Sequence, residues 1–524
     1  MKKVNILILL IGGVLLSACT SWLDVTPEDT VEEEDLFKES TGFHNALNGV
    51  YQQMASTSLY GRELTYGLLD AMGQVYQLYG ENYHYGAGIK SYHYYYQGTR
   101  FAYDANDDIK RAIESIWSKG YNTIANCNNI IRNIDALKTG DFRGGEAERQ
   151  MIKGEALAAR AWMHFDLLRL FAPALINDDQ GTYVPYVDTY PEIYATSMQV
   201  APFLDKVIAD LVKAKTLVAD FDTTAAGVLA SQSGVARMSK ARSLDNRFGY
   251  GDFFAGRGYR LSYYSITALL ARVYQYAGKM TEALVCAEEV LDFGKSFGKL
   301  FYKDDFSGIA NVGTNVEAFE QRSDLKLKSS LIFAAYNEKA YKESEIQRYF
   351  RLTTVDDNGT PVAPDYFKIK QVELFTSRGV EEWKTDIRSK NLIFMLQDVL
   401  PISGKWFVNS RKPEDSEHLK ISPVLRLTEI QYIMAECYAR KGNYGEAYRI
   451  LNDVRGARNL SPLIVQSSWE EFLTDLICDA RREWISEGQL FFLYKRLDAA
   501  FNLNGTMHKL SRGEASLPLP VDQK

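Results

Sequence analysis

The chain of 524 residues contains few of the residues on which many enzymes and disulfide-linked scaffolds depend. Its five cysteines stand singly at positions 19, 127, 286, 437 and 478, which argues against a disulfide framework or a zinc site. Only six histidines occur, none paired at metal-ligand spacing, and GxxxxGK[ST], HExxH and GxSxG motifs are missing. We therefore expect no enzyme and no bound cofactor or metal.

The chain also lacks an excess of positive charge. Its 60 Lys and Arg against 67 Asp and Glu give a net charge of -7, which argues against nucleic acid as a partner and suits a neutral ligand. Hydrophobic residues make up 46% and charged residues 24%, as in ordinary globular proteins. A chain of this length corresponds to roughly two to four domain-sized units.

A long apolar run occurs only at the N-terminus. Lys2 and Lys3 precede the apolar run from Ile6 to Leu16, which is typical of an export signal and too short for a permanent membrane span. The next residues, Leu16-Ser17-Ala18-Cys19, resemble the lipobox of bacterial lipoproteins. That resemblance implies that residues 1–18 are removed, that Cys19 carries a lipid anchor, and that the remaining body stands in water beside a membrane.

An internal repeat is the clearest structural pattern. The segment Leu270 to Ala283 recurs 164 residues later as Met434 to Ala447 with the same spacing of large, small, Tyr and Ala positions. This spacing is typical of tetratricopeptide-like helical hairpins, in which a glycine ends the first helix. We expect such hairpins at 264–292 and 427–455.

The rest of the chain is predicted to be mostly helical, with irregular insertions. Helical periodicity fails between about 296 and 425, where a strand-like run, Ser330 to Tyr336, lies among turn-forming residues. Interrupted helical scaffolds often place binding residues in such insertions. Further helices are expected at about 34–55, 107–137, 155–168, 203–221 and 470–498.

Tyrosine is concentrated in one segment. Nine of the 33 tyrosines lie between Tyr76 and Tyr103, interspersed with glycines. Tyrosine faces can stack on sugar rings while hydroxyl and amide groups bind sugar hydroxyls, so we expect an oligosaccharide site here. Alternatively, a β-hairpin from Ser91 to Phe101 packs half of its tyrosines against the helices, and we expect about a third of the cluster to face ligand.

The candidate ligand-binding residues come from this cluster and from the later insertion. Alternation along a strand would place Tyr94 and Tyr96 on one face and turn Tyr95 into the body. The candidates are Tyr83, Tyr85, Tyr94 and Tyr96, with Tyr336 and Trp383 as further partners.

Two carboxylates invite an enzymatic interpretation. Glu483 and Glu487 are four residues apart, so a continuous helix would place them on one face at a separation that glycoside hydrolysis could use. Hydrolysis requires carboxylates on both sides of a cleft, whereas these two share one wall beside Arg481 and Arg482. We therefore expect charge pairing rather than catalysis.

Several ordered motifs together resemble the SusD/RagB family from Cys19 to near Lys524. They are the lipobox, Leu23 to Pro27, Ile116 to Ile131, Lys153 to Phe171, the 426–458 hairpin, Arg481 to Gly488, and Leu517 to Pro520. The resemblance implies a lipid-anchored outer-membrane protein of Bacteroidota. Such a protein captures oligosaccharide, or sometimes peptide, at the cell surface for a SusC-like TonB-dependent transporter and does not cleave it.

The expected organisation is a signal peptide at 1–18, an N-terminal SusD-like region at 19–230 containing the tyrosine cluster, and a C-terminal region at 231–524 with the insertion at about 296–425. A second class of function stays open. A tetratricopeptide-like scaffold lipoprotein could bind only protein or peptide partners, and the helical repeat is compatible with either function.

Overall fold

The computed structural model describes residues 33–78, 93–192, 194–232, 237–238, 252–297, 324–350, 365–396, 400–407 and 415–520. The predicted signal peptide, Cys19, Tyr83 and Tyr85 lie outside these ranges. Within them, no helix has both the length and the apolar character that crossing a bilayer requires.

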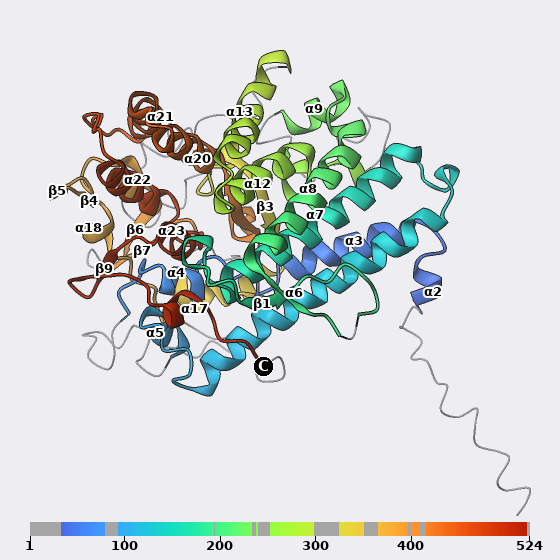
Figure 1. Ribbon diagram of the computed structural model, residues 1–524, viewed down its shortest axis with the longest axis horizontal. Helices are drawn as coiled ribbons and strands as arrows, with labels where there is room; N and C mark the ends of the chain where they lie inside the picture. Colours follow the sequence, from blue (N-terminus) through green and yellow to red (C-terminus); the bar gives the residue numbers. More distant parts are fainter. Residues whose placement is uncertain are drawn as a thin grey trace, which may run out of the picture.

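Long helices form the body of the molecule and pack side by side along the chain order (Figure 1). Several short helices and ribbons gather at one end of this array, near the labels α5, α18 and β9 in Figure 1, whereas α2 and α9 lie toward the other end. The longer helices are α3 (Ser40–Met54), α6 (Asp107–Asn133), α7 (Gly145–Phe171), α8 (Val200–Asp222), α12 (Tyr263–Tyr276), α13 (Met280–Phe297), α20 (Leu427–Arg440), α21 (Tyr444–Gly456), α22 (Trp469–Glu483) and α23 (Leu490–Leu497). The shorter helices are α2 (Glu33–Leu36), α4 (Leu68–Met72), α5 (Tyr94–Thr99), α9 (Ala225–Ser231), α16 (Ala340–Glu343), α17 (Ile346–Phe350), α18 (Gln371–Leu374), α19 (Ile387–Leu392) and α24 (Arg512–Ala515).

The two predicted hairpins are confirmed as α12–α13 and α20–α21. Gly278 and Gly442 follow the first helix of each pair with φ of 72° and 77°, in the left-handed region that favours glycine. Ala283 and Ala447 are fully buried, as expected where two helices approach closely. The repeated spacing therefore encodes repeated packing.

The other predicted helices also form, with two differences. The region 34–55 forms two helices, α2 and α3, rather than one. The region 470–498 contains two helices, α22 and α23, separated by a turn in which Gly488 has φ of 73°. At the start of α6, the Asn106 side chain accepts a hydrogen bond from the backbone N–H of Ile109 at 3.0 Å, so this residue caps the helix.

The strands form two-stranded antiparallel ribbons, of which β3 with β8 is buried against the helices. The predicted strand at Ser330 to Tyr336 is confirmed as β3, which pairs with a strand just before α20. The ribbons are β1 (Thr182–Pro185) with β2 (Ser197–Gln199), β3 (Leu331–Tyr336) with β8 (Ile421–Arg426), β4 (Thr376–Ser377) with β5 (Val380–Glu381), β6 (Ile393–Leu396) with β7 (Leu400–Ser403), and β9 (Phe501–Leu503) with β10 (Thr506–His508).

The predicted strand around Tyr94 to Tyr96 is wrong, because these residues begin the short helix α5. His93 caps this helix by accepting a hydrogen bond from the backbone N–H of Tyr95. Residues two apart on a helix are about 200° apart around its axis, so Tyr94 and Tyr96 do not share a face. Tyr95 is fully buried, as expected.

Candidate functional site

A large cleft lies at the end of the array near α5, α18 and β9. Its volume is about 870 Å³, within the range of small-ligand sites. Six separate segments line it: residues 74–78, 96–100, 368–373, Trp383, the β6–β7 ribbon and the β9–β10 turn.

Backbone hydrogen bonds hold the floor of this cleft together. The N–H of Gln77 donates to the carbonyl of Lys368 at 2.8 Å, and the N–H of Lys370 donates to the carbonyl of Val75 at 3.0 Å. The N–H of Ile369 donates to the carbonyl of Pro401 at 2.8 Å. These bonds join residues 368–370 to the loop that follows α4 on one side and to β7 on the other, so the floor is positioned by backbone rather than by long side chains.

Amide side chains supply polar groups along the wall. Gln74 donates through Nε2 to the carbonyl of Thr99 at 2.8 Å and accepts from Lys370 Nζ at 3.3 Å. On another wall, Asn504 and Gly505 form the two-residue turn between β9 and β10, with φ of 52° and 89°. Asn-Gly suits such a turn because both positions need positive φ. Asn502 accepts from the N–H of Gly505 at 2.8 Å, which stiffens the turn.

Two predicted ligand-binding residues, Tyr96 and Trp383, line this same cleft. Both are partly exposed. Arg100 donates to the Tyr96 hydroxyl at 3.2 Å, and Trp383 donates through Nε1 to Glu381 at 3.1 Å. The structure thus brings together two aromatic side chains 287 positions apart in the sequence, together with amides able to bind hydroxyl groups.

Tyr94 lines a different, smaller cleft of about 430 Å³. Its hydroxyl donates to Glu63 Oε1 at 2.8 Å, and its ring stacks against His93 with centroids 4.8 Å apart. Burial, followed by the charge of Glu63, raises the pKa of the Tyr94 phenol. The hydroxyl of Tyr94 is therefore occupied within the protein.

Tyr336 lies at the end of β3 and lines neither cleft. Its ring contacts Tyr259 edge to face with centroids 5.0 Å apart, and its hydroxyl bonds Glu338. Of the six predicted ligand-binding residues, the structure therefore joins Tyr96 and Trp383 and separates Tyr94 and Tyr336 from them.

The two carboxylates Glu483 and Glu487 are buried in ion pairs, but not with the neighbouring arginines. Glu483 accepts from Arg388 and Arg458, each at 2.6 Å, because it ends α22 and faces the segment around α19. Glu487 lies in the following turn rather than on the same helix face, where it accepts from Arg426 and Lys405.

The surroundings of both carboxylates favour their ionised forms. Burial alone would raise the pKa of Glu483, but the guanidinium groups of Arg458 and Arg388 hold it well below its usual range. Burial acts in the same way on the pKa of Glu487, and Arg426 and Lys405 outweigh it. Carboxylates held ionised and buried in this way serve as structural ion pairs.

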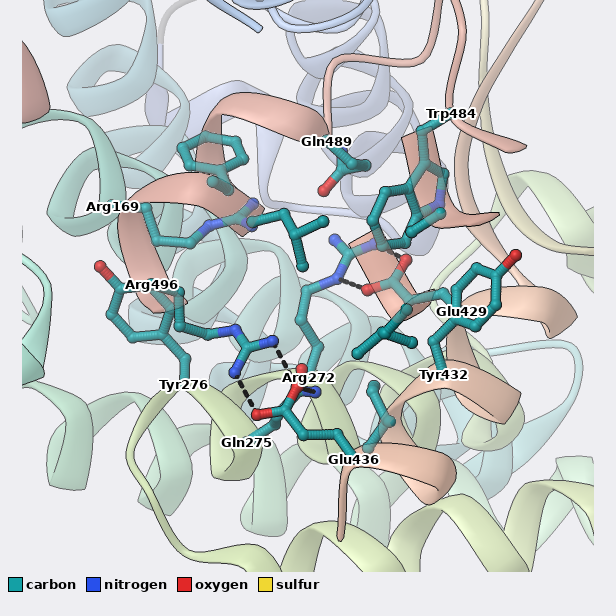
Figure 2. A pocket seen from close by; sticks show the side chains of 15 residues that line it. Arg169, Arg272, Gln275, Tyr276, Glu429, Tyr432, Glu436, Trp484, Gln489 and Arg496 are labelled. Carbon is teal, nitrogen blue, oxygen red and sulfur yellow. Dashed lines mark hydrogen bonds and ion pairs between the residues drawn. The ribbon is translucent and has the colours of Figure 1, made fainter. Parts of the chain in front are cut away.

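A small internal cavity lies between α7, α12, α20 and α23 (Figure 2). Two ion pairs line it: Arg272 with Glu429 at 2.6 Å, and Arg496 with Glu436 at 2.6 Å. The cavity measures about 40 Å³, which holds a few water molecules at ~10 to 15 Å³ each but no sugar ring. Because Arg272 and Glu429 belong to the two repeated hairpins, this pair joins them.

Sequence reasoning missed most polar residues of the larger cleft, including Gln74, Arg100, Lys370 and Asn502. The Asn504-Gly505 dipeptide between apolar residues was a usable hairpin signal. Within the ranges that the structure covers, no group of three or more His, Cys, Asp or Glu side chains is arranged to hold a metal ion.

The comparisons with known proteins agree with this fold. Residues 21–239 match a SusD-like family model whose description is starch-binding, associating with the outer membrane. This part of the chain is therefore similar to the SusD-like family. A search of curated proteins found no match to the chain.

Solved SusD-like structures share the fold over most of the chain. A SusD superfamily protein from Bacteroides thetaiotaomicron is 19% identical, covers 94% of this chain and 97% of its own, and has a TM-score of 0.61. A SusD-like carbohydrate-binding protein from Bacteroides vulgatus is also 19% identical, covers 88% and 84%, and has a TM-score of 0.61. A laminarin-binding SusD-like protein is 18% identical, covers 93% and 97%, and has a TM-score of 0.60. The helical, tetratricopeptide-like SusD fold is thus confirmed.

Proposed function

We propose that this SusD-like protein binds an oligosaccharide in the larger cleft, does not cleave it, and passes it to a SusC-like TonB-dependent transporter of the outer membrane. Cys19 is the lipid anchor in this proposal. The observation that carries it is the meeting of Tyr96 and Trp383 with amide side chains in one open cleft of about 870 Å³. The description of the matched family as starch-binding supports the same ligand class.

The cleft offers the chemistry that sugars require. Aromatic faces contact the apolar faces of pyranose rings, and Gln77, Gln371 and Asn504 can bind hydroxyl groups. The two carboxylates that would most readily support hydrolysis, Glu483 and Glu487, are buried in ion pairs away from this cleft. This distribution supports binding without cleavage.

The test is calorimetric titration of the protein lacking residues 1–19 with a panel of oligosaccharides chosen on a glycan array. Aromatic contacts are worth ~0.5 to 1.5 kcal/mol beyond area burial, so Tyr96→Ala or Trp383→Ala should weaken binding by up to about tenfold, and the double variant by more. Tyr194→Ala is the matched control, because Tyr194 is 90% exposed and does not line the cleft.

Three results would contradict the proposal. Full affinity in the folded double variant would remove these aromatic residues from the site. Release of reducing ends by the purified protein would overturn binding without cleavage. Binding of peptides but of no oligosaccharide would favour the protein-binding scaffold instead.

A further inference from the structure

Positive charge gathers around the larger cleft although the whole chain carries a net charge of -7. Arg100, Lys368 and Lys370 line the cleft, and Glu373 is the acidic side chain that lines it with them. A fourth cation, Lys384, lies 5.0 Å from the centroid of the Trp383 ring, and a carboxylate, Glu381, accepts a hydrogen bond from Nε1 of the same ring at 3.1 Å. An acidic protein with a locally cationic cleft attracts anionic ligands to that place.

Two of these cations donate their hydrogen bonds to neutral groups rather than to carboxylates. Arg100 donates to the Tyr96 hydroxyl, and Lys370 donates to the amide oxygen of Gln74. Neither forms an ion pair within the part of the chain that the structure covers. Their charges are therefore available to a bound molecule.

The smaller cleft on the other side of α5 provides an internal comparison. It also contains arginines, but Arg62 pairs with Glu63 at 2.8 Å, Arg111 with Asp108 at 2.5 Å, and Arg348 with Asp365. The arginines of that cleft therefore form ion pairs within the protein. Unpaired cations are thus a feature of the larger cleft rather than of this end of the molecule in general.

The cations also lie beside the aromatic residues on which sugar rings are proposed to rest. The guanidinium carbon of Arg100 is 5.7 Å from the centroid of the Tyr96 ring, and Lys384 has a similar relation to Trp383. A sugar in contact with either ring would hold its substituents within a few Å of a positive charge. A carboxylate or sulfate substituent would form a charge-assisted hydrogen bond there, whereas a hydroxyl forms a weaker one.

We propose that the ligand of the larger cleft is an anionic oligosaccharide, bearing carboxylate or sulfate groups that Arg100 and Lys370 bind. This inference rests on the proposed function and narrows its substrate class. It departs from the neutral ligand that the net charge of the chain alone suggests, because the net charge says nothing about where the charges lie.

The burial of Lys370 gives this assignment a measurable consequence. Burial lowers the pKa of its amine, and the charge of Glu373 opposes that shift only in part. An anion beside Lys370 would favour its charged form and raise the pKa again. Binding should therefore be accompanied by proton uptake at alkaline pH.

The experiment compares matched charged and neutral ligands by calorimetry. Hexagalacturonate is titrated against its fully methyl-esterified form, and a sulfated carrageenan oligosaccharide against its desulfated form, which separates carboxylate from sulfate. In a pair that binds, the charged ligand should bind at least tenfold more tightly than its neutral form. Its affinity should fall as salt is raised from 50 to 300 mM, and that of the neutral ligand should not.

Variants connect the preference to the named residues. Arg100→Gln and Lys370→Gln should each reduce the affinity for the charged ligand roughly five- to tenfold, a larger reduction than for the neutral ligand. Glu373→Gln should have the opposite effect on the charged ligand. Lys213→Gln, an exposed charge on α8, is the control and should change neither. Arg100 is exposed, so its variant should fold even if Lys370→Gln does not.

The outcomes separate this inference from the proposed function. Tighter binding of the neutral member of both pairs, or an unchanged preference in both cation variants, overturns the anionic ligand and leaves oligosaccharide binding intact. Failure of every charged and neutral oligosaccharide of the panel to bind overturns both.

Discussion

Gly488 offers a direct test of how the turn between α22 and α23 is packed. Its φ of 73° lies in the left-handed region, and a Cβ added there would lie 2.1 Å from the carbonyl oxygen of Leu64. Gly442 has nearly the same φ, 77°, but a Cβ added to it would meet no atom within 4 Å. Comparing alanine substitutions at these two glycines therefore distinguishes the cost of backbone strain, which both share, from the cost of the steric clash, which only Gly488 has.

The expected costs follow from these two environments. Alanine in the left-handed region costs ~1 to 2 kcal/mol, which is the whole expectation for Gly442→Ala. In Gly488→Ala the backbone around Leu64 must also move by about 1 Å, because an unstrained carbon–oxygen contact is over 3 Å; overpacking of this kind adds ~1 to 3 kcal/mol. That movement also disturbs the 2.8 Å hydrogen bond from the N–H of Gly488 to the buried carboxyl of Asp70.

The measurement is urea unfolding of both variants at equal protein concentration, monitored by circular dichroism. The free energies of unfolding are compared with the same dependence on urea concentration (m-value) for both variants. We expect Gly488→Ala to lose ~1 to 3 kcal/mol more free energy of unfolding than Gly442→Ala. Equal losses in the two variants would refute the close packing of this turn against the loop at Leu64.

Two further predictions concern the scaffold and the anchor. Ala447→Leu and Ala283→Leu should each lower the free energy of unfolding by ~1 to 3 kcal/mol, because a larger side chain overpacks a fully buried position. Ala201→Leu at an exposed position of α8 is the control and should not lower it. An unchanged thermal melt for both buried variants would contradict the hairpin packing. Cys19→Ala should move the protein from the membrane pellet to the soluble fraction of cells without a SusC-like partner, and retention in the pellet would remove Cys19 as the anchor.

The helical scaffold could be predicted because its causes are local. The period of apolar residues and the glycines at 278 and 442 specify helical hairpins without reference to distant residues. The strand expected at Tyr94 to Tyr96 was wrong because strand propensity was outweighed there. Consecutive tyrosines have high strand propensity, but the cap at His93 and the packing of Tyr95 in the core favour a helix there.

The cleft could be predicted only in part. Composition drew attention to Tyr96 and Trp383, which share the cleft, and equally to Tyr94 and Tyr336, which do not line it. Nothing along the chain distinguishes these four, because the distinction depends on which segments meet in space. The same holds for Arg100 and Lys370, whose charges are ordinary in the sequence and become distinctive only beside the aromatic rings.

The order in which the chain is synthesised has a consequence for the larger cleft. Its wall combines residues 74–78 with the Asn504-Gly505 turn, over 400 positions later. Long-range contacts of this kind form only after a large loop has closed. A growing or truncated chain that ends before β9 would lack this wall. The protein would therefore bind ligand in this cleft only after its C-terminal residues have been synthesised and folded.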